Sequence, residues 1–78
     1  GFSPERGLTT RFVEGAQVAT TMRERAEQTW LVADSSKFGQ AGFVSFLPLD
    51  AITGIITDSG LPDDAVEALK EHTHVRIV

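Results

Sequence analysis

The last part of the chain alternates short apolar runs with one amphipathic segment, and this pattern restricts the fold more than any other feature. The run "GIITD" (54–58) has the length and the branched residues of a buried strand. The segment "LPDDAVEALKEH" (61–72) predicts a helix, because Pro62 suits the first helical position and Asp63 and Asp64 complement the helix dipole. The run "HVRIV" (74–78) predicts another strand. A strand, a helix and a strand in this order favour a right-handed crossover that joins two parallel strands.

The upstream residues complete an α/β pattern. Residues 1–10 predict a loop, since glycine and proline punctuate them. Residues 12–28 predict a helix, because Val18, Met22 and Ala26 recur at four-residue spacing with Ala19 beside them. The runs 29–33 and 42–49 predict two strands, the second ended by Pro48. We therefore expect a mostly parallel sheet with flanking helices.

Composition narrows the function classes. The 78 residues, 41% of them hydrophobic, suffice for one small core. The absence of cysteine excludes disulfides and thiolate metal sites. A net charge of −4 and only seven basic residues argue against nucleic-acid binding by this segment. No apolar run approaches the roughly 20 residues that span a bilayer. The composition does not identify the compartment, although an intracellular protein fits it, and we expect a cytoplasmic protein without cofactor or membrane contact.

Polar clusters follow two of the predicted strands. One is Asp34, Ser35, Ser36 and Lys37, and the other spans residues 57–60, with Asp58 at its centre. In open α/β sheets, ligands collect outside the carboxyl ends of the strands. Serine hydroxyls, backbone N–H groups and a lysine amine suit an anion such as phosphate, and the carboxylates could accept hydrogen bonds from sugar hydroxyls or hold neighbouring loops.

Ordinary turn chemistry is the competing interpretation, because aspartate and serine are common turn residues. Catalysis is not indicated. Ser35 or Ser36 as a nucleophile would need a nearby base, and His72 and His74 belong to the opposite end of a strand–helix–strand unit. These histidines also lack a third partner at metal-ligand spacing. The sequence predicts neither a catalytic nor a metal site.

The order of "GFSPERGLTT", "MRERA", "LVADSSKFG", "FVSFLPLDAI" and "GIITDSGLP" resembles the C-terminal sensor domain of DeoR-type transcriptional regulators. "ADSSKFG" followed by "ITD" is the most specific pair. The resemblance implies a Rossmann-like sheet of the ribose-5-phosphate isomerase and coenzyme A transferase type. It also implies sensing of a phosphorylated sugar or related metabolite, usually in a repressor. A winged helix-turn-helix precedes the sensor domain in this family.

The resemblance assigns ligand-binding residues by motif. Asp34, Ser35, Ser36 and Lys37 match the D-S-S-K loop, with Lys37 as the phosphate contact, and Asp58 ends the I-T-D strand. The family's G-L-T-T loop, which lies beside the same pocket in the related fold, is matched by residues 7–10, including Thr9 and Thr10.

Two departures from the family pattern bear on these assignments. Ala19 stands where the family typically has a lysine after Glu14, Ala16 and Val18, so the ligand could differ or be absent. Residues 1–78 also lack the family's earlier sensor strands, its glycine-rich phosphate loop and its DNA-binding domain, so we expect a C-terminal fragment that is truncated at its N-terminal side.

Three functions follow from this reading. The first is an effector-sensing and oligomerising module, in which DNA is contacted only through the absent domain. The second is a fragment of a sugar-phosphate isomerase-like enzyme, although the acidic proton-transfer motif of such enzymes is not visible. The third is a dimerisation domain with a vestigial pocket. We expect a homo-oligomer in each case, because an unpaired sheet edge invites self-association.

Overall fold

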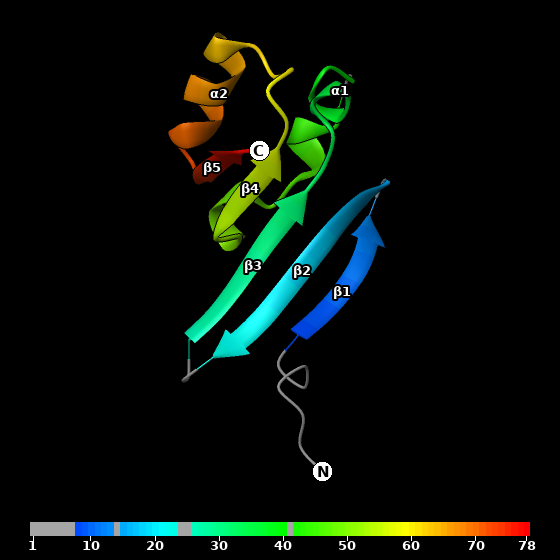
Figure 1. Ribbon diagram of the computed structural model, residues 1–78, viewed down its shortest axis with the longest axis vertical. Coiled ribbons are helices and arrows are strands. Elements are labelled where there is room, and N and C mark those ends of the chain that lie inside the picture. The colour runs from blue at the N-terminus through cyan, green and yellow to red at the C-terminus, as the bar shows by residue number, and fades with distance from the viewer. Residues whose placement is uncertain (1–7, 14, 24–25, 41) are drawn as a thin grey trace.

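The computed structural model describes residues 8–13, 15–23, 26–40 and 42–78 of the chain. Within them, five strands form one sheet in the order β1-β2-β3-β4-β5 (Figure 1). The strands are β1 (Leu8–Val13), β2 (Ala16–Arg23), β3 (Ala26–Val32), β4 (Gly54–Thr57) and β5 (His74–Ile77). Two α-helices, α1 (Ser35–Phe38) and α2 (Asp63–Lys70), and two 3-10 helices, η2 (Val44–Phe46) and η3 (Leu49–Ala51), complete the fold.

The described residues between 12 and 28 lie in β1, β2, β3 and the turn at Gly15, so the predicted helix is wrong. β1 pairs antiparallel with β2, and β2 pairs antiparallel with β3. Val18 and Met22 are four residues apart, a spacing that places two residues on one face of a strand as well as of a helix. The β-branched Thr20 favours the strand and bonds its hydroxyl to that of Thr29 across β2 and β3 at 3.1 Å. The loop predicted for residues 1–10 is wrong for residues 8–10, which belong to β1, and residues 1–7 of that prediction lie outside the described part of the chain.

The strand–helix–strand unit at the end of the chain is confirmed. β4 pairs parallel with β5, and α2 connects them and packs against β5. The helix begins at Asp63, one residue later than predicted. Pro62 therefore occupies the N-cap and not the first helical position. β3 pairs parallel with β4, with Leu31 opposite Ile55, so the strand predicted for 29–33 is also confirmed, although it begins at Ala26.

The segment 42–49 contains no strand, and its prediction is wrong. Its backbone turns at Gly42, which has a φ of 84°, and Ser45 donates a hydrogen bond from its hydroxyl to the Gly42 carbonyl at 2.9 Å. The amides of Phe46 and Leu47 then bond to carbonyls three residues back, which is the 3-10 pattern. Phe43 is buried and meets the edge of the Phe38 ring at a centroid distance of 5.3 Å. The apolar residues therefore fill the core from a loop.

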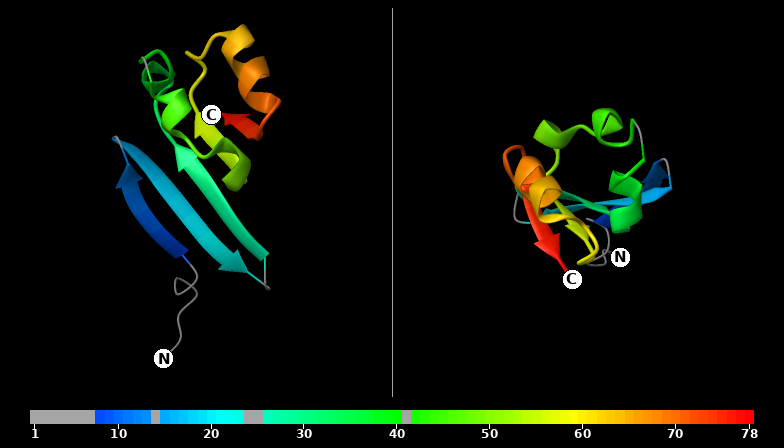
Figure 2. Two further views of the ribbon diagram at one scale, coloured as in Figure 1. Left: turned by 180° about the vertical axis from the view of Figure 1, so that it is seen from behind. Right: turned by 90° about the horizontal axis from the view of Figure 1, so that it is seen from above.

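The sheet has one covered and one bare face. The cross-strand register places Val18, Leu31 and Ile55 on the same face, where Phe43 of the loop and Leu69 of α2 pack over them (Figure 2). None of the described helices covers the opposite face. This bare face carries a row of residues across the sheet, namely Phe12, Gln17, Val32, Ile56 and Arg76.

The α/β class is confirmed, but the mostly parallel sheet is not. Two neighbouring pairs of strands are antiparallel and two are parallel, and the antiparallel pairs have the longer registers. The hairpin extends beyond the helices, so the molecule is elongated, with extents of 45 × 22 × 22 Å (Figure 1). Only the β3–β4–β5 part has the parallel order that the sequence predicts, and the candidate site lies at its carboxyl edge.

Candidate functional site

The carboxyl ends of β3 and β4 bring the two predicted polar clusters together. The Ser35 amide, at the start of α1, donates a hydrogen bond to Asp58 Oδ2 at 3.0 Å. The Gly60 amide donates to Asp58 Oδ1 at 2.8 Å. A single carboxylate thus bonds to the loop after each strand. The expectation that the two clusters lie side by side is confirmed, and Asp58 holds the neighbouring loops.

The same contacts change the ionisation of Asp58. Hydrogen bonds from the Ser35 amide and hydroxyl, and from the Gly60 amide, favour the carboxylate and lower the pKa of Asp58 from its ordinary value. Asp58 is therefore ionised at neutral pH. Since each of its oxygens already accepts a backbone amide, its main role in this structure is to fix the geometry of the edge.

Asp34 differs from Asp58 in the hydrogen bonding of its side chain. It occupies the N-cap position of α1 with an extended backbone, but its side chain makes no capping hydrogen bond. The side chain is exposed, and it lines a pocket of about 320 Å³ at the carboxyl edge. Its carboxylate can accept hydrogen bonds from donors that enter this pocket.

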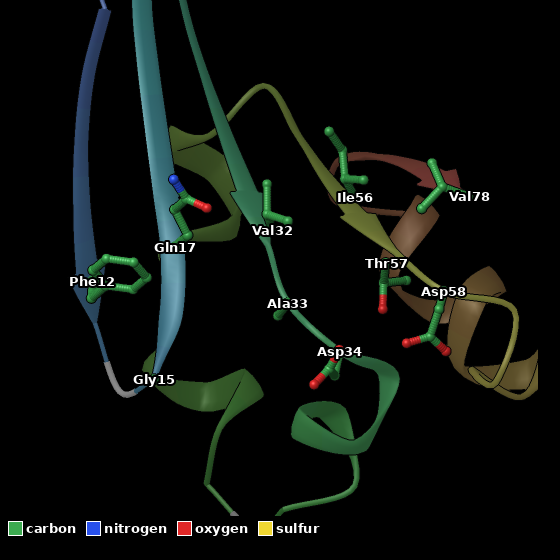
Figure 3. A pocket seen from close by; sticks show the side chains of 10 residues that line it. All are labelled: Phe12, Gly15, Gln17, Val32, Ala33, Asp34, Ile56, Thr57, Asp58 and Val78. Carbon is green, nitrogen blue, oxygen red and sulfur yellow. The ribbon is translucent and has the colours of Figure 1, made fainter.

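The pocket opens over the bare face and the strand ends (Figure 3). Apolar side chains from four strands or strand ends form one part of its wall, and polar groups of Gln17, Asp34, Thr57 and Asp58 form the other. Its lining residues are Phe12, Gly15, Gln17, Val32, Ala33, Asp34, Ile56, Thr57, Asp58 and Val78. An apolar wall with a few polar groups is the usual composition of a small-molecule site.

The Lys37 side chain lies close to Gly15, a residue that lines this pocket. Gly15 forms the turn between β1 and β2 with a φ of 84°, and it lines the pocket. A Cβ at Gly15 would lie 2.5 Å from Lys37 Nζ and 3.2 Å from Lys37 Cε. The lysine side chain therefore passes close to Gly15, which lines the cavity, although Lys37 is not itself a lining residue.

The remaining predicted site residues are placed less centrally. Ser35 is half-buried and bonds to Asp58, whereas Ser36 is exposed on α1. Thr9 and Thr10 lie on β1 opposite Thr20 and Ala19, and neither lines the pocket at the carboxyl edge. Thr9 lines a separate cavity with Arg11, Thr20 and Glu27. The structure does not bring the two threonines to Asp34 and Asp58, so their role in binding stays a prediction.

Several pocket residues were not identified from the sequence. Phe12, Gly15 and Gln17 enter the pocket from the β1–β2 hairpin, which the sequence pattern had suggested to be helical. Gly15 was the available signal, because a glycine between two alternating segments marks a hairpin turn. Thr57 was part of a predicted cluster, and its burial follows because it shares the covered face of β4 with Ile55.

Two further observations concern the position of His74 and the character of the described helices. His74 pairs with Gly54 at the amino end of β4, the end away from Asp58, as the sequence suggests. Among residues 8–13, 15–23, 26–40 and 42–78, no helix combines the length and the apolar character that crossing a membrane requires.

Comparisons with known proteins give a consistent family. The family model of the DeoR C terminal sensor domain matches residues 1–59. The HTH-type transcriptional regulator GlpR of Haloferax volcanii is 41% identical over 66 residues, which cover 85% of this chain and 26% of that protein. The uncharacterized HTH-type transcriptional regulator YulB of Bacillus subtilis is 38% identical over 91% of this chain and 28% of its own length.

A third relative is named as the putative repressor of an operon. The putative aga operon transcriptional repressor of Escherichia coli O157:H7 is 36% identical over 86% of this chain and 25% of its own length. The chain thus spans about a quarter of the length of these curated relatives. No solved structure gives a significant match to the chain.

Proposed function

Because the chain belongs to the family of DeoR C-terminal sensor domains, we propose that it binds a phosphorylated sugar or a related metabolite at the carboxyl edge of β3 and β4. The binding would regulate transcription, in most members by releasing a repressor from DNA. The names of the relatives support this assignment, since they describe transcriptional regulators, including a putative repressor of an operon. DNA would be contacted by a helix-turn-helix domain in another part of the protein.

The observation that carries the proposal is the meeting of opposite chemistries at one pocket. Asp34 offers a carboxylate with no capping hydrogen bond, and Lys37 brings its amine to the rim over Gly15. A sugar phosphate has both hydroxyl donors and an anion, so the carboxylate suits the sugar and the amine suits the phosphate. Ser35 and Ser36 precede Lys37 on α1 without lining the pocket, and Asp58 holds the two loops in place.

Calorimetry of the full-length protein tests this function. Fructose 6-phosphate, glucose 6-phosphate, ribose 5-phosphate and glycerol 3-phosphate form a suitable panel of probes. We expect one or more to bind, and Lys37→Ala to weaken that binding roughly 10- to 100-fold, since a hydrogen bond to a charged group contributes about 1.5–3 kcal/mol.

The matched control is Lys70→Ala. Lys70 lies on α2 with its amine 4.0 Å from Glu67, away from the pocket at the carboxyl edge. Its replacement should leave the affinity unchanged. If no probe binds to the wild type and operator affinity does not respond to any of them, the sensor function is refuted. If a probe induces normally in the Lys37→Ala variant, the effector is bound without Lys37, and the reading in which this pocket is vestigial and the domain dimerises is favoured.

Regulation would follow from linkage between the pocket and the assembly. A ligand that binds one arrangement of subunits better shifts the population toward it and changes the spacing of the DNA-binding domains. We expect a homo-oligomer in the cytoplasm. The bare face supports this, because Phe12 is 75% exposed and Val78 is 77% exposed on it.

Light scattering of a Phe12→Asp variant tests the oligomer. Phe46→Asp is the control, since Phe46 is also exposed but lies on η2, away from the bare face. The first substitution should dissociate the oligomer and the second should not. A wild-type protein that remains a monomer at high concentration would contradict the expectation.

We also propose that the domain is a sensor without catalytic activity. The described histidines give no base at the pocket, because His74 lies at the amino end of β4 and His72 follows α2. A test for turnover of ribose 5-phosphate by the full-length protein should be negative, and isomerisation above the rate of a heated control would overturn this statement.

A further inference from the structure

We propose that the open edge of β5 and the outward side of α2 form a self-complementary interface, on which a second copy of this chain docks with the two β5 strands antiparallel. This contact goes beyond the sensing function, because it depends on no bound ligand. It is also separate from the bare face, since it uses the strand edge and the covered side of the sheet. The two contacts together would join dimers into a larger assembly.

The first observation is the open edge of β5. This strand is the last in the sheet, and among the described strands it pairs only with β4. The Val78 amide donates to the Thr57 carbonyl of β4 at 2.9 Å. Because successive residues of a strand direct their backbone groups to alternate sides, the amides and carbonyls of Val75 and Ile77 point away from β4. These groups are available to a strand that adds to this edge.

The second observation is that the edge lacks the usual protection against pairing. Natural proteins often place lysine or proline on an edge strand, and β5 contains neither. Its arginine is turned away from the edge, because the Cζ atom of Arg76 lies 5.4 Å from the centre of the Trp30 ring on β3. That ring lies against Gly54 of the intervening β4. The charge of Arg76 therefore lies over the sheet and leaves the edge free.

The third observation is a groove of about 400 Å³ between α2 and this edge. Its lining includes a set of residues from the helix and one from the strand, namely Asp63, Val66, Glu67 and Lys70 of α2 and Ile77 of β5. The spacing of three and four residues places the helical members in one stripe. Figure 1 shows α2 and β5 together at one border of the molecule. Ile77 is 42% exposed and Val66 is half-buried, so the groove has apolar surface that a docked copy would cover.

The order of charges along this stripe identifies a second copy as the occupant. Antiparallel pairing of two β5 strands about a two-fold axis also makes the two α2 helices antiparallel. Asp63 at the start of one helix then lies opposite Lys70 at the end of the other, and the same contact recurs across the axis. Lys70 is available for this contact, because its ion pair with Glu67 of the same helix is long, at 4.0 Å. Val66 lies midway between Asp63 and Lys70, so it falls near the axis.

Charge reversal tests this antiparallel arrangement. Asp63→Lys and Lys70→Asp each place like charges opposite one another at both symmetric contacts, so each variant alone should dimerise roughly 10- to 100-fold more weakly. An equimolar mixture of the two variants restores opposite charges at both contacts, and its affinity should return to within about threefold of the parent protein. Removal of one charge without reversal, as in Lys70→Ala, has a small effect, because exposed ion pairs contribute little.

The measurement is light scattering of the full-length protein over a range of concentrations. The Phe12→Asp background removes the bare-face contact, and the β5 contact should then hold a dimer. Asp64→Lys is the matched control, since Asp64 neighbours Asp63 on α2 but does not line the groove, and it should leave dimerisation unchanged. A Phe12→Asp protein that is a monomer at high concentration would overturn the inference, as would a mixture that dimerises no better than its components.

Hydrogen exchange tests the strand edge in the wild-type protein, where no substitution disturbs folding. The amides of Val75 and Ile77 should exchange more slowly as the protein concentration rises, because pairing protects them. The Val78 amide is bonded within one chain, so it should be protected at every concentration. Exchange of Val75 and Ile77 that does not depend on concentration would overturn the inference. Neither experiment uses a sugar phosphate, so a failure of such probes to bind would refute the proposed function and leave this inference intact.

Discussion

Truncation of Ile55 to alanine should remove a large part of the stability of the domain. Ile55 is 0% exposed in the middle of β4, between β3 and β5. The substitution deletes three carbon atoms, and at about 0.8 kcal/mol for each buried methylene the transfer loss alone is about 2.4 kcal/mol. A residual cavity adds to this loss, and measured values for such substitutions are about 2–5 kcal/mol. We expect a decrease of about 3 kcal/mol in the free energy of unfolding.

The size of the domain makes this loss easy to detect. A chain of 78 residues has a total stability of about 4–12 kcal/mol at about 0.05–0.15 kcal/mol per residue. Urea unfolding of a small domain has a slope of about 1 kcal/mol per molar or slightly more, so the midpoint should fall by about 3 M at most. Fluorescence of Trp30, the single tryptophan, reports the transition, because its ring lies against Gly54 of β4.

The control is the same substitution on the neighbouring strand. Ile77 of β5 is 42% exposed, so Ile77→Ala forms no closed cavity and should cost about 1 kcal/mol or less. If both variants lose the same stability with unchanged slopes, the core is not centred on β4, and the reasoning from burial fails.

Three other substitutions test contacts at the site and beside it. Asp58→Asn should destabilise the protein at pH 7 and flatten its acid unfolding profile. The pKa of Asp58 is lowered in the folded state. Its contribution to stability is therefore present above the ordinary value near 3.8 and is lost as the pH falls through the lower pKa. Thermal melts in which the variant shows the same pH profile as the wild type would contradict this. Gly54→Ala should cost about 1–3 kcal/mol in urea unfolding, because the new methyl group would meet the Trp30 ring, and an unchanged midpoint would refute the contact. Gly15→Ala should displace the amine of Lys37 and weaken sugar-phosphate binding in calorimetry, and it strains a turn with a φ of 84°, so full affinity would show that the amine does not contact the ligand.

The sequence predicts the part of the fold in which local pattern and topology agree. Pro62 and the acidic residues after it mark the start of α2, and the crossover rule then gives parallel pairing of β4 and β5. The same logic predicts that Asp34 and Asp58 lie together, and the hydrogen bond between Ser35 and Asp58 confirms it. These predictions succeed because the carboxyl ends of parallel strands share an edge of the sheet.

The errors arise where one pattern fits two structures. Val18 and Met22 share a face in a helix and in a strand, and the choice depends on the hairpin partners, which the local sequence does not show. Phe43 and Phe46 were assigned to a strand because they are apolar, but Phe43 enters the core from a loop and Phe46 is exposed. The hairpin supplies Gly15 and Gln17 to the pocket, so the missed hairpin also explains the incomplete site.

The carboxylate of Asp58 has a mechanical consequence. It joins the loop that opens α1 to the turn that leads into α2, although Ser35 and Gly60 are far apart along the chain. While both hydrogen bonds persist, a displacement of one loop also moves the other. A small shift imposed at one strand end is thereby shared by two helices at once, through a route that bypasses the interior of the sheet.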